Sequence, residues 1–122
     1  MIFAVARLTL NSPMVHFVPM RRIITRKRLR EYAENHPRAK ASLLHWEKTT
    51  LAASWRTPAD LKQSFNDVDA VEVASGHTIY VFNIERNAHR LIAAIHFNMG
   101  MVFVLRILTH REYDQGNWKE NL

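Results

Sequence analysis

The C-terminal half of the chain places apolar side chains at alternate positions in four short runs. The runs are "DAVEVA" (69–74), "TIYVFNI" (78–84), "HRLIAAIHF" (89–97) and "MVFVLRILT" (101–109). They are separated by "SGH", "ERNA" and "NMG", which are short and polar enough to form hairpin turns. Because short connections join antiparallel neighbours, this pattern predicts a meander of antiparallel strands.

The N-terminal half has helical spacing instead. After a short strand over 20–24, Thr25 is placed to cap a helix that ends near Asn35, and a second helix is predicted over about 38–54. The inner faces of these helices are expected to carry Leu29, Tyr32, Ala33, Leu43, Leu44, Leu51 and Trp55. "TPADLKQSF" (57–65) predicts a two-turn helix capped by its threonine. The predicted fold is therefore α+β, a helical hairpin packed on one face of a mostly antiparallel sheet.

The 122 residues suit a single domain, and they include no cysteine, which excludes disulfides and thiolate chemistry. The formal net charge is +6, and residues 20–40 alone hold eight Lys or Arg against two Glu. A concentrated basic segment attracts polyanions: nucleic acid, an anionic membrane surface or an acidic protein. A solvated helix face is the alternative explanation. If the segment binds nucleic acid, Arg26, Lys27 and Arg28 are the expected phosphate contacts.

Residues 1–19 differ from the rest of the chain. They are apolar, yet Arg7 and the segment Asn11-Ser12-Pro13 interrupt any run long enough to span a bilayer. They also lack the basic leader and the cleavage site of a secretory signal. We expect 1–19 to be a poorly packed extension or the product of an upstream start, and 20–122 to be the domain.

If the strands alternate strictly, one face of the sheet is apolar and covers the core under the helical hairpin. This face is expected to carry Tyr80, Phe82, Ile84, Leu91, Ala93, Ile95, Phe97, Met101, Phe103, Leu105 and Ile107. The opposite face is expected to carry His77, Ile79, Val81, Asn83, Arg90, Ile92, Ala94, His96, Val102, Val104, Arg106 and Leu108. A bulge at Gly100 would shift the last strand by one residue.

On this opposite face, which we call the second face of the sheet, hairpin pairing places Asn83 opposite Arg90. It also places Ile92 opposite Arg106, so the two arginines are diagonal neighbours. Like charges this close repel each other unless an anion or an acidic group lies between them. Small or aliphatic neighbours would form a shallow floor, an arrangement that suits a phosphate site. The alternative is that Glu72 or an acidic residue near the C-terminus neutralises the pair.

The segment "THREYD" follows the last strand directly. Its Thr109 and Glu112 have the spacing of a capping box, which predicts a short final helix. His110, Arg111 and Tyr113 then remain to face the arginine pair. The other histidines have no metal-ligand spacing, and the chain has no glycine-rich phosphate loop, so metal and nucleotide cofactors are not expected.

From Met20 to about Trp118 the chain resembles the HigB toxin family, a RelE-like group of ribosome-dependent mRNA interferases. The matching segments are "IITRKRLREYAENHPRAK", "DLKQSF", "IYVFNI" with "HRLIAAIHF", and "VLRILTHREYD". The resemblance implies a cytoplasmic toxin that a HigA-type helix-turn-helix antitoxin holds inactive. It also implies cleavage of mRNA on the ribosome without a metal or a small-molecule cofactor, by attack of a ribose 2′-hydroxyl on the adjacent phosphate.

That chemistry requires a base, an acid and cations that stabilise the phosphorane. In this chain Arg90 and Arg106 suit charge stabilisation, and His110 suits proton transfer. Tyr113 is expected to orient the substrate or to donate to it. The residues expected to contact RNA are Lys62, Asn83, Arg111, Arg26, Lys27 and Arg28.

Two other functions fit the same residues. One is a non-catalytic basic module that binds RNA or DNA and whose arginines only hold phosphate. The other is a RelE-fold homologue that has lost cleavage and acts on a different target. Both differ from the toxin in that binding leaves no cut products.

Overall fold

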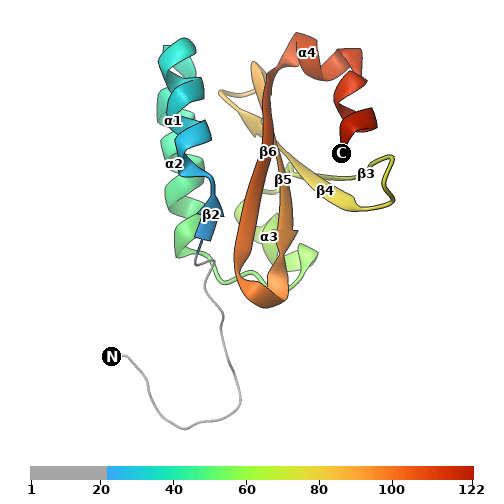
Figure 1. Cartoon of the computed structure of the whole chain (residues 1–122). Helices are drawn as coiled ribbons and strands as arrows, with labels where there is room; N and C mark the ends of the chain where they lie inside the picture. The colour runs from blue at the N-terminus through green and yellow to red at the C-terminus, as the bar shows by residue number, and fades with distance from the viewer. Residues whose placement is uncertain (1–21) are drawn as a thin grey trace, which may run out of the picture.

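The computed structural model describes residues 22–122 and contains one five-stranded sheet in the order β2-β6-β5-β4-β3 (Figure 1). The strands are β2 (Arg22–Ile24), β3 (Asp69–Glu72), β4 (Thr78–Ile84), β5 (His89–His96) and β6 (Met101–Thr109). Strands β3 to β6 form the predicted antiparallel meander, while β2 pairs with β6 in parallel. The α+β fold is confirmed, and the expected extension 1–19 lies outside the described residues.

The α-helices are α1 (Arg26–Asn35), α2 (Lys40–Ala52), α3 (Pro58–Ser64) and α4 (His110–Gln115). Three short 3₁₀ turns join or follow these elements, at Pro37–Ala39, Phe97–Met99 and Asn117–Asn121. Between residues 22 and 122, no helix is both long and apolar enough to cross a membrane.

The helical hairpin α1–α2 packs against one face of the sheet through a buried apolar cluster. Leu29 of α1, Trp46 of α2 and Phe82 of β4 belong to it. The Trp46 and Phe82 rings meet edge-on, with their centroids 5.5 Å apart. Leu61 of α3 is fully buried in the same cluster. Three helices and the sheet therefore share one main core, which we call the hairpin-side core.

Helix α2 is rotated from the predicted orientation. It buries Leu43 and Trp46, whereas Leu44 is 43% exposed, so the prediction that Leu44 lies on the inner face is wrong. The reason is size, because an indole buries more apolar area than a leucine side chain, and burying Trp46 turns Leu44 outward. The helix also ends at Ala52, before the predicted end, and the buried Trp55 reaches the core from the segment that follows.

Strand β6 contains a β-bulge at a position that the alternation did not predict. Ile92 of β5 pairs with Arg106, as expected. The next residue of β5, Ala93, pairs with Val104, so Leu105 is an extra residue on β6. The bulge therefore lies at Leu105 and not at Gly100.

The bulge reverses the faces of the residues that precede it. Val102 and Val104 are buried in the hairpin-side core, so the prediction that they face the other way is wrong. The prediction that Met101, Phe103 and Leu105 face the hairpin is wrong for the same reason. Leu105 packs against a second cluster, on the opposite face of the sheet.

That second cluster covers the face that the sequence analysis expected to be a shallow open floor. Ile79, Val81 and Ile92 are buried there beneath Trp118, which is 6% exposed. The 3₁₀ turn that contains Trp118 follows α4 and brings the C-terminus back beside β3 and β4 (Figure 1). The carbonyl of Lys119 accepts a hydrogen bond from the backbone N–H of Ala74 at 3.4 Å, which ties this turn to the sheet.

Two of the three proposed helix caps form. The Thr57 hydroxyl accepts from the N–H of Asp60 at the start of α3. Thr109 and Glu112 form the complete predicted capping box at the start of α4. Thr25 occupies the N-cap position of α1, but its side chain makes no capping hydrogen bond.

The orientation of α2 leads to a test with two adjacent leucines. We expect Leu43→Ala to lower the free energy of unfolding by about 2–5 kcal/mol, because it opens a cavity in the core. Leu44→Ala serves as the matched control, and its cost should stay within about 0.5 kcal/mol because the side chain is largely exposed. Urea denaturation followed by circular dichroism measures both. Equal losses would contradict the rotation of the helix.

Candidate active site

Arg90 lies where the β4–β5 turn meets the second face of the sheet. It pairs with Asn83 across the β4–β5 ladder, as predicted. Its Nη1 donates to the carbonyls of Asn87 and His89, at 2.9 and 3.2 Å. These two carbonyls hold one edge of the guanidinium against the turn, while Nη2 points toward helix α4.

His110, the first residue of α4, receives that second contact. Arg90 Nη2 lies 3.0 Å from His110 Nδ1. Because an arginine only donates hydrogen bonds, Nδ1 must be the unprotonated acceptor, and the ring proton belongs on Nε2. His110 Nε2 lies 3.0 Å from Asp114 Oδ2, one helical turn further on. The two neighbours thus assign the neutral tautomer with its lone pair directed at Arg90.

The start of α4 is also tied to the turn through the backbone. The N–H of His110 donates to the carbonyl of Ala88 at 2.9 Å. This bond and the capping box fix the first turn of α4 beside the β4–β5 turn. The elements that carry Arg90 and His110 are therefore held together independently of the contact between their side chains.

Tyr113 completes a group of three predicted site residues that the structure brings together. The guanidinium carbon of Arg90 lies 5.4 Å from the centre of the Tyr113 ring, within range of a cation–π contact. The other side of the ring stacks on Trp118, with centroids 5.1 Å apart and planes 20° from parallel. Burial is the main cause that raises the pKa of the Tyr113 phenol, and Asp69 raises it further, while Arg90 opposes this. The phenol therefore stays protonated at neutral pH.

Arg106 lies on the same face, and the bulge determines its surroundings. Its Nη1 donates to the carbonyl of Leu105 at 2.8 Å, and Arg28 of α1 donates to the same oxygen at 3.3 Å. Within residues 22–122, no ion pair joins Arg90 or Arg106 to a carboxylate. The alternative of neutralisation by Glu72 or a C-terminal acid is thus not what the described residues show.

The other predicted RNA contacts do not all converge on this group. Asn83 is adjacent to Arg90, but its amide donates to Asp67 at 2.9 Å. Lys62 is exposed on α3, which packs on the hairpin-side core and so lies on the other side of the sheet. Arg111 is exposed on α4 directly after His110.

The basic residues at the start of α1 have different surroundings. Arg26 forms an ion pair with Glu47, a carboxylate that is 4% exposed, and Arg30 lies 3.6 Å from the same oxygen. Arg26 therefore has a structural partner that the sequence analysis missed. Lys27 makes only a long contact of 3.7 Å with Glu31, and its side chain is 81% exposed.

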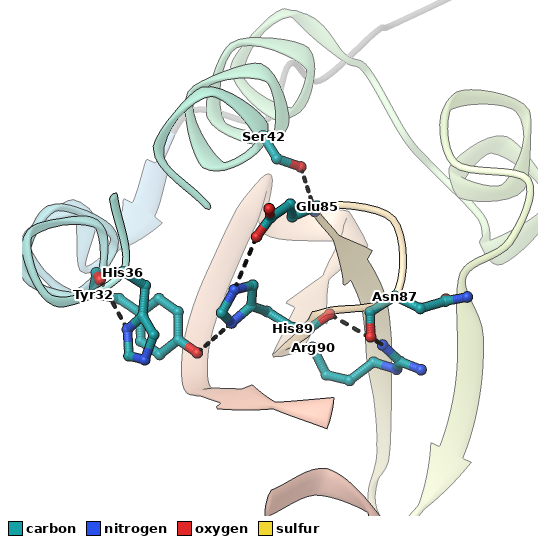
Figure 2. Close-up of polar contacts among 7 residues, drawn as sticks. All are labelled: Tyr32, His36, Ser42, Glu85, Asn87, His89 and Arg90. Atoms are coloured by element: carbon teal, nitrogen blue, oxygen red, sulfur yellow. Dashed lines mark hydrogen bonds and ion pairs between the residues drawn. The ribbon is translucent and has the colours of Figure 1, made fainter. Parts of the chain in front are cut away.

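A cluster of polar aromatic side chains next to Arg90 was also missed (Figure 2). The hydroxyl of Tyr32 lies 2.6 Å from His89 Nδ1, and His89 Nε2 lies 3.2 Å from Glu85 Oε1. His36 stacks on the Tyr32 ring with centroids 4.0 Å apart. The backbone N–H of Glu85 donates to Ser42 of α2 at 2.9 Å. These contacts join both hairpin helices to the turn that carries Arg90.

The sequence did contain a signal for this cluster. Strict alternation along β5 puts His89 on the same face as Leu91, and Tyr32 is on the predicted inner side of α1. A histidine and a phenol that face each other across a core are expected to share a hydrogen bond. His89 is 7% exposed and is the only histidine buried among the described residues. In the same part of the chain, no group of three or more potential metal-ligating side chains occurs.

The sequence profile of HigB toxins, described as the RelE-like toxic component of a toxin-antitoxin system, matches residues 39–116. The chain belongs to the HigB toxin family. The matched range contains Arg90, Arg106, His110 and Tyr113, whereas the basic start of α1 precedes it.

Curated members of the HigB family show the same similarity. The mRNA interferase toxin HigB of Escherichia coli K12 is 32% identical over 92 residues, which cover 75% of this chain and 86% of that protein. The mRNA interferase HigB proteins of Escherichia coli O157:H7 and Shigella flexneri have the same identity and coverage.

The Tyr32–His89 cluster gives a prediction about alkaline pH. Burial, with a smaller contribution from Glu112, raises the pKa of Tyr32 to about 12, above its usual value of 10.0. Because the folded state favours the neutral phenol, this stability is complete below pH 10 and is lost as the pH rises toward 12. We expect Tyr32→Phe to show a smaller fall in the free energy of unfolding across that window than the unmodified chain.

Urea denaturation at a series of pH values measures this difference. Tyr80→Phe is the comparison variant. Burial also raises the pKa of Tyr80, so this variant should lessen the alkaline loss too, but by a smaller amount, and that phenol does not belong to the Tyr32–His89 cluster. At neutral pH Tyr32→Phe should cost about 1 kcal/mol for its lost hydrogen bond, and Tyr80→Phe should cost less. Identical alkaline losses in Tyr32→Phe and the unmodified chain would contradict the assignment.

Proposed function

We propose that this HigB family member is an mRNA interferase, an endoribonuclease that cuts translated mRNA on the ribosome. The observation that supports this most is the convergence of Arg90, His110 and Tyr113, with Arg106 on the same face and, within residues 22–122, no carboxylate paired to either arginine. Two arginines without acidic partners on one face provide charge for an incoming phosphate. The names of the curated relatives point to the same activity.

Arg90 and Arg106 stabilise charge in the proposed reaction. When the ribose 2′-oxygen attacks the adjacent phosphorus, negative charge accumulates on the phosphoryl oxygens. Both guanidinium groups remain cationic at any working pH, and both extend from paired strands. Among the described residues, the Arg106 side chain makes one hydrogen bond, to the Leu105 carbonyl, which it can exchange for a phosphate oxygen.

His110 is the proposed base. A phosphate that draws Arg90 toward itself leaves the Nδ1 lone pair of His110 to accept the 2′-hydroxyl proton. Asp114, hydrogen-bonded to Nε2, would stabilise the imidazolium that forms. The bond from the 2′-oxygen to phosphorus forms as the bond to the 5′-oxygen breaks, which leaves a 2′,3′-cyclic phosphate and a 5′-hydroxyl.

Tyr113 is proposed to donate a hydrogen bond to the substrate, not to ionise. Its pKa is raised, so the phenol keeps its proton throughout the neutral range. Stacking on Trp118 fixes the ring, and the phenol can then orient either the phosphate or the leaving 5′-oxygen. The proton that the 5′-oxygen finally takes is supplied by water.

The exposed basic residues of α1 are proposed to dock the protein on ribosomal RNA. Lys27 and Arg28 lie on the surface, and Arg28 is also linked to the Arg106 strand through the Leu105 carbonyl. Contacts of this kind with phosphate are independent of sequence and depend on salt. In the cell, we propose a cytoplasmic location and inhibition by a HigA-type helix-turn-helix antitoxin, consistent with the family's place in toxin-antitoxin systems.

A purified translation system with primer-extension mapping of 5′ ends tests the activity. We expect cuts within the translated message, and a loss of about 10²–10³ in rate for Arg90→Ala, because charge stabilisation is removed. His110→Ala should lose about 10²–10⁴ in rate. His45→Ala, on the surface of α2, is the control histidine and should cut normally.

Two outcomes would change this assignment. Full cutting by His110→Ala beside inactive Arg90→Ala would remove His110 as the base but keep the site. Ribosome binding by the unmodified protein with no cut products would support the non-catalytic alternative.

Docking through α1 is tested separately from cutting. We expect Lys27→Ala combined with Arg28→Ala to weaken ribosome binding, to reduce its salt dependence, and to leave the cut positions unchanged. Arg26→Ala is the contrasting variant. It should mainly lower the free energy of unfolding, by about 1–3 kcal/mol, because Glu47 would keep only the longer contact with Arg30. Sedimentation across a salt series and thermal unfolding measure the two effects, and unchanged binding by the double variant would count against this docking surface.

A further inference from the structure

The bulge in β6 exposes an aromatic ring on the face that carries Arg90 and Arg106. Phe103 is directed to this face because Val102 and Val104, on either side, are buried in the hairpin-side core. Phe103 itself is only half-buried, which is unusual for a phenylalanine in a paired strand. The ring of His96 on β5 meets it edge-on, with centroids 5.2 Å apart.

A basic residue lies on the neighbouring edge strand, two residues before the Ile24 that pairs with Phe103. Arg22 of β2 pairs with Met101 and is exposed. Ile23 is buried in the hairpin-side core, so Arg22 faces the same way as Phe103. We call Arg22, His96, Met101 and Phe103 the Phe103 strip.

An open hollow of about 710 Å³ at the end of β5 shares His96 with the strip. Its lining residues are Arg56, His77, Thr78, Ala94, Ile95, His96, Phe97 and Asn98. None of these side chains is acidic, and they include one arginine and two histidines. The hollow therefore offers one guanidinium, two imidazoles and one side-chain amide, and no acidic side chain in its lining repels an anion.

The strip and the candidate active site lie on the same face of the sheet. Between them on β5, Ile92 is fully buried in the cluster that contains Trp118, whereas Arg106, Leu105 and Phe103 of β6 are only partly buried. Arg90, Ile92, Ala94 and His96 alternate along the same face of β5. The distance from Arg90 to His96 along the strand is about 20 Å, at roughly 3.3 Å per residue. Several nucleotides of extended single-stranded RNA cover such a distance. A strand of RNA with one phosphate at Arg90 and Arg106 would therefore reach Phe103 if it followed β6, whose residues on this face are partly exposed.

We propose that the Phe103 strip and the adjoining hollow bind the single-stranded RNA nucleotides that flank the one held at Arg90. One base stacks on Phe103 and His96, and flanking phosphates meet Arg22 and the hollow. Single-stranded RNA is the partner that fits, because a base supplies an aromatic face and the backbone supplies negative charge in alternation. This inference rests on the proposed function. It adds a second region of RNA contact, which would fix the direction in which the mRNA strand crosses the sheet.

Binding of uncleavable RNA of two lengths tests the proposal. The probes are a 2′-O-methyl trinucleotide and a 2′-O-methyl octanucleotide, measured with the whole chain by fluorescence anisotropy. We expect the octanucleotide to bind more tightly, and Phe103→Leu to weaken its binding about tenfold, as loss of one base-stacking contact does. Trinucleotide binding should not change, because it needs only Arg90 and Arg106.

Two further variants keep the test independent of folding. Arg22→Gln, at an exposed edge position, should reduce the salt dependence of octanucleotide binding alone. Leu44→Ala, which removes an exposed apolar side chain on the distant helix α2, should change neither affinity. Circular dichroism and thermal unfolding check whether Phe103→Leu retains the fold.

Three results would overturn the proposal. The first is equal affinity for the two lengths, and the second is octanucleotide binding that Phe103→Leu leaves unchanged while Arg90→Ala weakens it. In that second case the proposed cleavage activity stands and only the strip is removed. The third is a Phe103→Leu variant that loses self-association but not RNA affinity, which would assign the strip to contact between copies of the chain. Loss of the proposed function is recognised differently, by the absence of cut products in translation.

Discussion

The hydrogen-bonded register of β5 between β4 and β6 is the constraint on which the rest of the structure depends. This strand is buried on both faces, with Leu91 toward the helical hairpin and Ile92 toward Trp118. A slip of one residue would send Arg90 into the hairpin-side core and turn Leu91 into the candidate site. Because apolar groups are buried on both faces of β5, its register fixes the position of Arg90 as firmly as that of Leu91.

Around β5, the candidate active site is formed by the ends of secondary-structure elements. Contacts other than the hydrogen bonds between strands hold these ends together. The β4–β5 turn, the end of β6 and the start of α4 meet at one end of the sheet. The Ala88 carbonyl and the capping box of Thr109 fix α4, and the Tyr32–His89 hydrogen bond fixes the turn to α1. The site thus has supports from both layers of the fold, and the positions of its side chains do not depend on any single loop.

The sequence predicted those features that local rules control. Apolar residues that recur every two residues in strands and every 3.6 residues in helices are short-range patterns. The Asn83–Arg90 hairpin pairing and the Thr109–Glu112 cap are short-range as well. Most of the misses depend on how the elements pack in the folded chain, although the Thr25 cap, a local feature, also failed to form. The bulge at Leu105 follows from which valines fit under the hairpin, and no rule of alternation contains that information. The ion pair of Arg26 with Glu47 and the packing of Trp118 with Ile79 and Ile92 likewise join residues whose proximity only the folded chain determines.

The contact between Arg90 and His110 has a consequence for discrimination among ligands. In the proposed reaction, the Arg90 guanidinium binds the phosphate, and at rest it occupies the lone pair of His110. Binding of phosphate to Arg90 and release of that lone pair are therefore thermodynamically linked. A neutral nucleoside, or water alone, has no means of drawing Arg90 away and therefore meets a histidine whose lone pair is already engaged. Only a ligand with a phosphate at the right position exposes that lone pair. Selectivity for a polyanion would then come from the resting state of the protein as well as from the affinity of its arginines.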